Sequence, residues 1–576
     1  MPPLGNPKRW PFFIRHPYLE RDLTDSEIID RWQKEPAPLL PLLHAFHDRD
    51  ECLTDDAIRV ISSTLRIPLA ELYGTITFYH HLSRGEVTRS TPRVCVGPVC
   101  KQLGSHRILE RLKNEGAIPI ACPGRCDTPV PVIRGSQVEI VGDLETHDRP
   151  SQLPPPNPAG SEECVFSEIR ESGRHTLEGY KKSGGYTALE KAIDLGPEAV
   201  IKEISEARLV GRGGAGFPTG RKWQAVRDAP GTPKSIVCNA DEGEPGCFQD
   251  RVILDHDPHA LIEGMTIAGL AADAQRGFIY LRYEYPLAME VLSQAIEEAE
   301  EAGILGERVL GSNNTFSIHI RRGGGAYICG EETSLLNSLE GKHPYPRNRP
   351  PYPVTNGFED LPTVVNNVET LAVVPQILRK GAAWHISLGL GDNTGTKVIS
   401  VSGDIRNPGN YEIPVGLPLR TLLEEWAGGA HGGRTIQAVT MAGVSGGFLA
   451  GTDLDVALDE PSVREKGALL GAAGIMVFDD SRNIVDVASS VMHFFSEESC
   501  GKCFPCRIGT RRMYERLEGE HGTGEAKEWR SEMEDMSFTM RATSACGLGQ
   551  AAPLIVESLD RYFPEAVDQH IQKSQQ

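Results

Sequence analysis

The stretch "FSIHIRRGGGAYICGEETSLLNSLEGK" (residues 316–342) begins as a β-like run, passes through three consecutive glycines, and continues with helical periodicity. A strand, a glycine loop and a helix N-terminus together make a phosphate site, because the first turn of the helix presents free N–H groups. Two acids, Glu331 and Glu332, stand where the helix is expected to begin. They either bind ribose hydroxyls or complement the helix dipole. The stretch predicts an α/β domain with a glycine loop of the kind that binds nucleotides.

Helical patterns alternate with short β-like runs over residues 165–395, which we predict to form the largest α/β domain. Its first glycine-rich loop, "GRGGAGFPTGRKW" (211–223), formally matches G-x-G-x-x-G. The preceding residues Val200, Ile201 and Ile204 have helical spacing, whereas a dinucleotide fingerprint follows a strand. An ordinary Rossmann turn is therefore not expected. The loop still offers open amides for phosphate, and Lys222 adds a positive charge, although a turn chosen only for packing is the alternative.

Two further segments carry dense sets of polar side chains. "CNADEGEPGCFQDR" (238–251) ends a β-like run, and strand-end polar groups commonly meet ribose or flavin edges. "PTVVNNVETL" (362–371) offers neutral hydrogen-bonding side chains. The candidate residues in these two segments are Asn239, Asp241, Glu242, Glu244, Asn366, Asn367 and Thr370.

Eight of the thirteen cysteines fall into two constellations. In the first, Cys95 and Cys100 form one pair, and Cys122 and Cys126 form the other. Four thiolates from two loops suit a zinc ion or a [2Fe-2S] cluster. Neither pair has the two-residue spacing that zinc ribbons prefer, so we favour the iron–sulfur cluster.

The second constellation lies in "SCGKCFPCRIGT" (499–510), where Cys500, Cys503 and Cys506 follow a strict three-residue spacing. Cys546 is the only cysteine further along the chain. Three ligands in C-x2-C-x2-C with one remote ligand commonly hold a [4Fe-4S] cluster, whereas zinc sites more often pair their ligands two and two. We predict a [4Fe-4S] cluster here.

The remaining segments complete a multidomain α/β prediction. Residues 1–90 are expected to form a helical cap, residues 91–148 a compact α/β unit around the first cysteines, and the proline-rich residues 149–164 a linker. Residues 396–480 read as strand, turn, strand and helix, which suggests a β-grasp insert. Residues 481–576 read as a helical bundle.

Composition excludes several functions. A net charge of −20 argues against binding a nucleic-acid backbone, which needs a basic face. No apolar run approaches the length that spans a bilayer, so direct membrane insertion is not expected. The first residues break any apolar stretch with prolines and charges, unlike a signal peptide, and a cytoplasmic location is expected.

Five segments occur in an order that resembles the NADH-binding flavoprotein subunit of respiratory complex I: GRGGAGFPTGRKW, CNADEGEPG, GAYICGEETSLLNSLEGK, PTVVNNVETL and SCGKCFPCRIGT. The resemblance extends from about residue 170 to the end. The first 150 residues resemble the thioredoxin-like [2Fe-2S] partner subunit. The two are fused here, as in the diaphorase subunits of NAD-reducing hydrogenases and of NAD-dependent formate dehydrogenases. The resemblance implies a Rossmann-like FMN and NAD domain and an insert of the SLBB type.

The resemblance also implies roles for individual residues. FMN would lie against the first glycine loop, with its ring or ribityl chain near residues 239–242 and its phosphate near residues 366–370. The expected FMN contacts are Gly211, Gly213, Gly214, Lys222, Asn239, Asp241, Glu242, Tyr327, Gly330, Glu331, Asn366, Asn367 and Thr370. NAD(H) would meet Phe217, Glu244 at the hydride-transfer site, Glu332, and the loop 347–353 with Arg349 and Tyr352. Here Arg349 replaces a usual lysine, Tyr352 a usual phenylalanine, Gly243 a common serine, and Ala225 an aromatic residue. A carboxylate at Glu332 favours NAD over NADP.

By this resemblance the chain exchanges hydride between NAD(H) and FMN and passes single electrons between FMN and the two clusters. The [4Fe-4S] cluster is the expected first acceptor, and the [2Fe-2S] cluster is a side store or an exit. Other redox subunits, with iron–sulfur clusters and a substrate-specific metal site, would complete a hetero-oligomeric complex, such as a formate dehydrogenase or hydrogenase. The alternatives are an electron-bifurcating complex, a complex I-type NADH:quinone oxidoreductase, and a zinc-stabilised scaffold with vestigial flavin loops.

Overall fold

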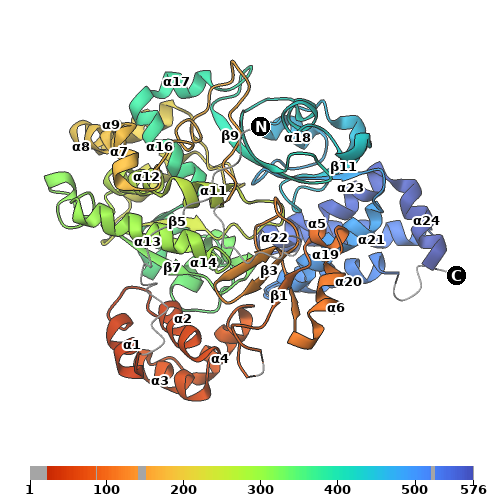
Figure 1. The fold of residues 1–576 in the computed structure, drawn as a ribbon, viewed down its shortest axis with the longest axis horizontal. Helices are drawn as coiled ribbons and strands as arrows, with labels where there is room; N and C mark the ends of the chain where they lie inside the picture. Colours follow the sequence, from red (N-terminus) through yellow and green to blue (C-terminus); the bar gives the residue numbers. More distant parts are fainter. Residues whose placement is uncertain (1–22, 86, 141–150, 520–525, 575–576) are drawn as a thin grey trace, which may run out of the picture.

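The computed structural model describes residues 23–85, 87–140, 151–519 and 526–574. Figure 1 shows a cap of helices at the bottom, the largest α/β unit at the left, and the C-terminal helices beside a second α/β unit at the right. Three sheets organise the described residues, with strand orders β2-β1-β3-β4, β7-β6-β5-β8 and β10-β9-β13-β11-β12. The predicted multidomain α/β arrangement is confirmed. The predicted boundary between residues 148 and 149 lies outside the described residues.

The central sheet is parallel throughout, and its strands are β5 (Ser235–Ala240), β6 (Arg276–Leu281), β7 (Ser317–Arg322) and β8 (Thr363–Asn367). Most of their residues are buried, as expected for parallel strands covered by helices on both faces. The surrounding helices are α7 (Leu177–Lys182), α8 (Thr187–Leu195), α9 (Pro197–Glu206), α10 (Thr219–Asp228), α11 (Gln249–His256), α12 (Pro258–Ala272), α13 (Pro286–Glu301), α14 (Glu332–Leu339), α15 (Pro353–Asn356), α16 (Val368–Lys380) and α17 (Ala382–Ser387).

Strand order in this sheet determines where a ligand can bind. The chain runs outward from β5 through β6 to β7 and then returns to add β8 on the other side of β5. The carboxyl ends of β5 and β8 therefore flank a topological switch point, which is where open α/β sheets bind ligands. Helix packing behind the sheet is close: a Cβ on Gly264 of α12 would lie 2.0 Å from the carbonyl oxygen of Leu371 in α16, so glycine is required there.

The N-terminal cap consists of α1 (Asp25–Trp32), α2 (Leu39–Asp50), α3 (Asp55–Leu65) and α4 (Leu69–Phe78). Thr24 begins α1 with a capping box to Glu27. The cap is joined to the central sheet by a buried ion pair, because Asp48 of α2 lies 2.6 Å from Arg322 of β7 and 2.9 Å from Arg89.

The predicted [2Fe-2S] unit has a small sheet of β1 (Arg93–Cys95), β2 (Ile118–Ile120), β3 (Pro131–Arg134) and β4 (Gln137–Ile140), with α5 (Pro98–Gln102) and α6 (Ser105–Arg111). After it, residues 151–163 contain no helix or strand. This segment ends at the carboxylate of Glu412, which accepts hydrogen bonds from the amides of Cys164, Val165 and Phe166 at 2.7–3.0 Å. The predicted linker therefore docks on the insert.

The insert has its own hydrophobic core. Its strands are β9 (Thr396–Gly403), β10 (Gly409–Pro414), β11 (Ile436–Thr440), β12 (Phe448–Ala450) and β13 (Gly474–Asp479), with a π-helical turn at Thr421–Trp426 and α18 (Glu460–Glu465). The C-terminal helices are α19 (Ile484–Glu498), α20 (Phe504–Leu517), α21 (Ala526–Thr543), α22 (Gly547–Ala551), α23 (Leu554–Tyr562) and α24 (Pro564–Ser574).

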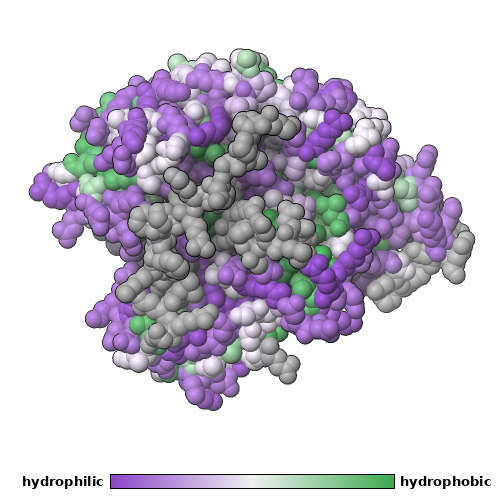
Figure 2. Space-filling view, in the orientation of Figure 1, coloured by the Kyte–Doolittle hydropathy of each residue, from purple (hydrophilic) through white to green (hydrophobic). Residues whose placement is uncertain are grey.

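The surface of the described residues on the face in Figure 2 is mainly hydrophilic, with separate hydrophobic patches. Within the described part of the chain, no helix is both long and apolar enough to span a bilayer.

Candidate functional site

The first glycine loop lies at the switch point. It follows α9, as the helical spacing predicts, and closes with a bridge between Val210 and Pro218 before α10 begins. The amide of Arg212 donates to Oγ1 of Thr370 at 2.8 Å. A Cβ on Gly213 would lie 3.0 Å from Cβ of Asn367, so the loop rests directly on the end of β8.

Glycine at position 214 meets a conformational requirement. Gly214 has φ +112°, and a Cβ there would approach the backbone of residues 471–472 in the insert at 3.5 Å. On the other side, a Cβ on Gly216 would meet nothing within 4 Å. The loop is thus packed on one side and open on the other, which suits a planar group lying against bare backbone.

The neutral side chains after β8 hold the loop and the helix behind it. Asn367 accepts the amide of Thr370 as the N-cap of α16, and its Nδ2 donates to Asp250 at 2.7 Å. Asn366 accepts the indole N–H of Trp223 at 2.9 Å. These contacts bring Asn366, Asn367 and Thr370, the residues expected to bind the FMN phosphate, together with the glycine loop. Each of the three also makes a hydrogen bond that stabilises the fold.

Asp241 after β5 is the clearest open acceptor. It is 4% exposed, and its Oδ2 has no hydrogen-bond partner among the described residues. Burial raises the pKa of Asp241 well above its usual range. Asn239 nearby donates to the carbonyl of Gly330 at 2.8 Å, which joins β5 to the second glycine loop. A buried carboxyl oxygen without a partner fits a ligand that supplies a hydrogen-bond partner.

Glu242 and Glu244 point to different surroundings. Glu242 accepts from the amide of Asp250 at 2.7 Å and from the hydroxyl of Tyr285 at 2.6 Å, and neither partner belongs to the glycine loop. Glu244 accepts from the amides of Val444 and Ser445, both at 2.9 Å, and from the hydroxyl of Tyr327. Burial raises the pKa of Glu244 to about 7.

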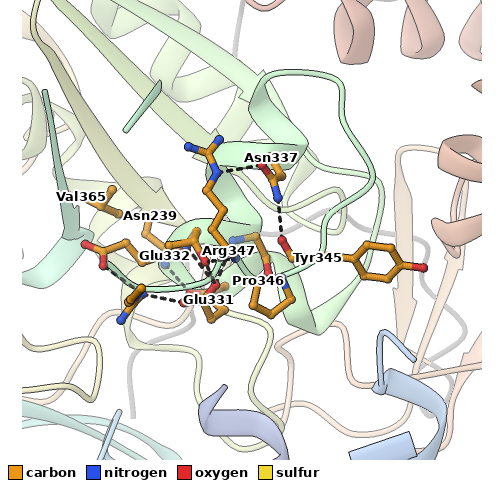
Figure 3. A network of polar contacts seen from close by, with 12 residues as sticks. Asn239, Glu331, Glu332, Asn337, Tyr345, Pro346, Arg347 and Val365 are labelled. Carbon is orange, nitrogen blue, oxygen red and sulfur yellow. Dashed lines mark hydrogen bonds and ion pairs between the residues drawn. The ribbon is translucent and has the colours of Figure 1, made fainter. Parts of the chain in front are cut away.

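The two acids at α14 differ in role. Glu331 is the N-cap of this helix, and its Oε2 accepts the amides of Thr333 at 3.0 Å and Ser334 at 2.9 Å. For Glu331, the helix-dipole interpretation therefore describes what the side chain does. Figure 3 shows Glu331 and Glu332 next to each other, with Asn239 and Val365 nearby.

Glu332 is held by two cations. Lys222 lies 3.2 Å from its Oε1 and also donates to the carbonyl of Val365 at 2.8 Å. Arg349 lies 3.2 Å from its Oε2 and 2.7 Å from Glu331. Phe217 and Tyr352 are 47% and 54% exposed, as expected of side chains that stack on a bound ring rather than fill the core.

The first four cysteines form one buried cluster. Cys95, Cys100, Cys122 and Cys126 are all buried, and the sulfur atoms of Cys122 and Cys126 lie 3.3 Å apart. Cys95 is hydrogen-bonded to Cys100 and Cys122, so the predicted pairs do converge. The set offers four soft thiol donors from two loops, which fits a [2Fe-2S] cluster.

Residues that the sequence did not single out join this cluster to the central sheet. Arg282 donates to the carbonyl of Cys122 at 2.9 Å, and Arg251 donates to the carbonyl of Gly124 at 2.9 Å and to Asp127 at 2.7 Å. The amide of Gly246 hydrogen-bonds Cys126. Arg251 is the last residue of the polar segment 238–251, but nothing local marks it as an interface residue.

The second cysteine set surrounds two helix starts. Cys503 is the N-cap of α20 and Cys546 the N-cap of α22. Burial raises the pKa of Cys506 to about 12 and that of Cys546 to about 11. The amide of Tyr327 donates to Glu498, two residues before Cys500, at 2.9 Å, so this set lies beside the second glycine loop.

The donor set of Cys500, Cys503, Cys506 and Cys546 is four soft thiols, three of them in C-x2-C-x2-C with one remote ligand, which fits a [4Fe-4S] cluster.

Comparisons with known proteins show the family of this chain. Residues 204–376 match the family model of the Nuo51 FMN-binding domain, and residues 486–570 match that of the NADH-ubiquinone oxidoreductase-F iron-sulfur binding region. The chain is 45% identical over 404 residues to the F 2 subunit of NADH-quinone oxidoreductase from Rhizobium meliloti, covering 69% of this chain and 95% of that protein.

The chain belongs to the NADH-quinone oxidoreductase F family. Another similar protein is the NADP-reducing hydrogenase subunit HndC of Solidesulfovibrio fructosivorans, 41% identical, with 69% of this chain and 81% of that protein covered. Among solved structures, an NAD+-reducing [NiFe]-hydrogenase in the air-oxidised state aligns with a TM-score of 0.78 and 30% identity, covering 94% of each chain.

Two further family models complete the domain series of this F-family chain. Residues 26–139 match the thioredoxin-like [2Fe-2S] ferredoxin, a range that includes most of the cap, and residues 398–448 match the SLBB domain. The predicted fold class is confirmed, as are the cofactors FMN, NADH, [4Fe-4S] and [2Fe-2S]. The chain is a flavin and iron–sulfur oxidoreductase that oxidises NADH.

Proposed function

We propose that the open side of the first glycine loop, the ends of β5 and β8, and the second glycine loop form one site for FMN and NAD(H). The observation that carries this proposal is the unpaired carboxyl oxygen of Asp241 just after β5, where a Cβ on Gly330 of the second glycine loop would lie 3.6 Å from it. When bound, FMN supplies exchange of hydride with NAD(H) and of single electrons with iron–sulfur clusters.

The residues of this site would bind FMN and NAD(H) and orient them relative to each other. The amides of Gly213 and Gly214 would meet the flavin, and Asp241 would form a hydrogen bond with it. Glu244 carries a pKa of about 7, so it would hold or release a proton near the nicotinamide at neutral pH. Glu332 would accept the adenosine ribose hydroxyls, with Lys222 and Arg349 fixing its carboxylate.

Electrons would leave through the thiol-bound clusters. The amide of Tyr327 donates to Glu498, two residues before Cys500, at 2.9 Å, and the charge of Glu331 acts on Cys546, which supports the [4Fe-4S] cluster as first acceptor. The amide of Gly246, in the polar segment after β5, hydrogen-bonds Cys126. This contact between the flavin domain and the first cysteine set supports the [2Fe-2S] cluster as a side store or an exit for electrons.

The parent complex is a finer proposal. The 30% identity over 94% of a chain from an NAD+-reducing [NiFe]-hydrogenase supports a fused diaphorase subunit with partners that carry clusters and a substrate-specific metal. A complex I-type enzyme is the second candidate, favoured by the 45% identity to an NADH-quinone oxidoreductase chain. Formate dehydrogenase and electron-bifurcating complexes stay hypotheses, as does a cytoplasmic location. Nickel in the co-purified complex would indicate a hydrogenase, and molybdenum or tungsten a formate dehydrogenase.

The core of the proposal is tested by anaerobic titration of the full chain with NADH. Bleaching of the flavin band and an electron paramagnetic resonance signal from a reduced [4Fe-4S] cluster are expected. Cys546→Ser should keep flavin-level dye reduction and lose transfer to the physiological partner. Cys52→Ser, at a half-buried cysteine outside both sets, is the control and should change neither. Unchanged transfer to the partner in Cys546→Ser would overturn the assignment of the first acceptor.

A further inference from the structure

Lys502 lies inside the cysteine loop, between Cys500 and Cys503, and its two ends face different parts of the molecule. Its backbone amide hydrogen-bonds Cys500. Its Nζ donates to the carbonyl of Pro346 and, at 3.3 Å, to Oδ1 of Asn348. One residue therefore connects a predicted cluster ligand with a segment more than a hundred residues earlier in the chain.

That segment, residues 343–352, we call the dinucleotide loop, because it contains Arg349 and Tyr352. Its first half is anchored by the cap, because the ring of His343 packs against that of Phe78 in α4 with a centroid distance of 4.6 Å. Within the loop, the His343 ring stacks on that of Tyr345 with a centroid distance of 4.0 Å.

The middle of the dinucleotide loop is anchored by Arg347. Its amide donates to Thr333 and its Nε to Asn337, both at 2.8 Å. Figure 3 shows Tyr345, Pro346 and Arg347 next to Asn337 and the two acids.

The second half of the dinucleotide loop has fewer anchors. Among the described residues, the side chain of Asn348 has no hydrogen bond other than the one from Lys502. Arg349 follows at once and reaches back to Glu331 and Glu332. The ammonium of Lys502 thus restrains the segment that leads to the point where Arg349 joins the acids.

We propose that Lys502 is a positioning residue for NAD(H), which fixes the dinucleotide loop against the iron–sulfur loop and couples the two. This inference rests on the proposed function, in which the dinucleotide loop binds NAD(H). A loop already held in its bound conformation costs less ordering on binding, so the effect falls on binding rather than on the chemical step.

The coupling is reciprocal. If reduction of the cluster changes the affinity for NAD(H), then binding of NAD(H) must change the free energy of cluster reduction by the same amount. When NAD(H) tightens the dinucleotide loop, the ammonium of Lys502 is held in place, and its positive charge, which acts on Cys500, favours the reduced cluster. Removing the ammonium should therefore lower the midpoint potential of the [4Fe-4S] cluster and abolish its dependence on NAD+.

The test compares Lys502→Met with Lys502→Arg in the full-chain holoprotein. Lys466→Met is the matched control, because Lys466 is an exposed lysine whose Nζ pairs with Asp453 at 2.7 Å in the insert. Three measurements are made: hydrogen exchange of peptides that cover residues 343–353, KM and kcat for NADH with a flavin-level dye, and the cluster potential with and without NAD+.

For Lys502→Met we expect faster exchange in the dinucleotide loop and a KM about three- to tenfold higher with kcat unchanged, the size of one charge-assisted hydrogen bond at a partly exposed position. Lys502→Arg should restore both, and Lys466→Met should change neither. The inference would be overturned if Lys502→Met had the same exchange rates and the same KM as the unchanged chain. It would also be overturned if Lys466→Met changed both quantities as much as Lys502→Met does. If the unchanged chain fails to reduce its flavin with NADH, the proposed function fails instead.

Discussion

Replacing Glu244 with glutamine should remove a proton that titrates near neutral pH. Burial raises the pKa of this carboxyl from 4.5 to about 7. Glutamine has nearly the same shape and can keep every contact, because its oxygen can accept the amides of Val444 and Ser445 while its amide group donates to Tyr327. The variant therefore changes the charge and leaves the packing in place.

The magnitude follows from the pKa. A rise of about 2.5 pH units at about 1.4 kcal/mol per unit corresponds to about 3 kcal/mol. The sign is that of a raised acid: below pH 4.5 both states hold the proton, and between pH 4.5 and 7 only the folded state keeps it. This contribution to the free energy of unfolding is thus present at low pH and is lost as the pH rises through about 7.

Two assays measure it. Infrared titration of the wild-type chain minus Glu244→Gln should show one protonated carboxyl band that disappears near pH 7. The difference in unfolding free energy between the two proteins should change by about 3 kcal/mol from pH 4 to pH 8. Glu465→Gln, at an exposed glutamate of the insert, should leave the band near pH 7 unchanged. A wild-type midpoint near 4.5 would refute the argument that burial controls this carboxyl.

Three further outcomes are expected. Because Glu332 repels a 2′-phosphate, kcat/KM for NADH should exceed that for NADPH, and Glu332→Ala should narrow the ratio; comparable values in the wild type would contradict this. Glu412→Ala leaves the amides at 164–166 without their acceptor, so a loss of about 3–5 kcal/mol in unfolding free energy is expected by denaturant titration, with a smaller loss for Glu412→Gln. Arg251→Met leaves Asp127 buried without its cation, and we expect faster proteolysis of the [2Fe-2S] unit with the flavin retained; an unchanged proteolysis rate would argue against this interface.

Local patterns predicted many of the elements and the cysteines of each short loop. The helical spacing of Val200, Ile201 and Ile204 excluded a strand before the first glycine loop, and α9 occupies that position. The cysteine spacings predicted which thiols of one short loop lie together, because ligands within one short loop cannot separate far. The approach of Cys122 to Cys95 depends on the tertiary fold. The resemblance then supplied cofactors that spacing alone left open between iron–sulfur and zinc.

Long-range contacts were not accessible in the same way. Nothing near Glu242 in the chain indicates that its carboxylate turns to Tyr285, and nothing near Lys502 indicates Pro346. Such pairs depend on how separately folded units pack. The buried side chains of Arg251 and Arg282 bind Asp127 and the carbonyl of Cys122 across the interface with the [2Fe-2S] unit, not residues of their own helix or strand.

The order of the units, the cysteine loops and the glycine loops could be predicted from the residues alone, because these features depend on spacing and on backbone freedom along a few residues. The different roles of the acids follow only from contacts in the folded molecule. Glu331 caps a helix, Glu332 is held between two cations, and Glu244 is buried against the insert with a pKa of about 7. Identical carboxylates acquire these differences from burial and from neighbours that are distant in the chain.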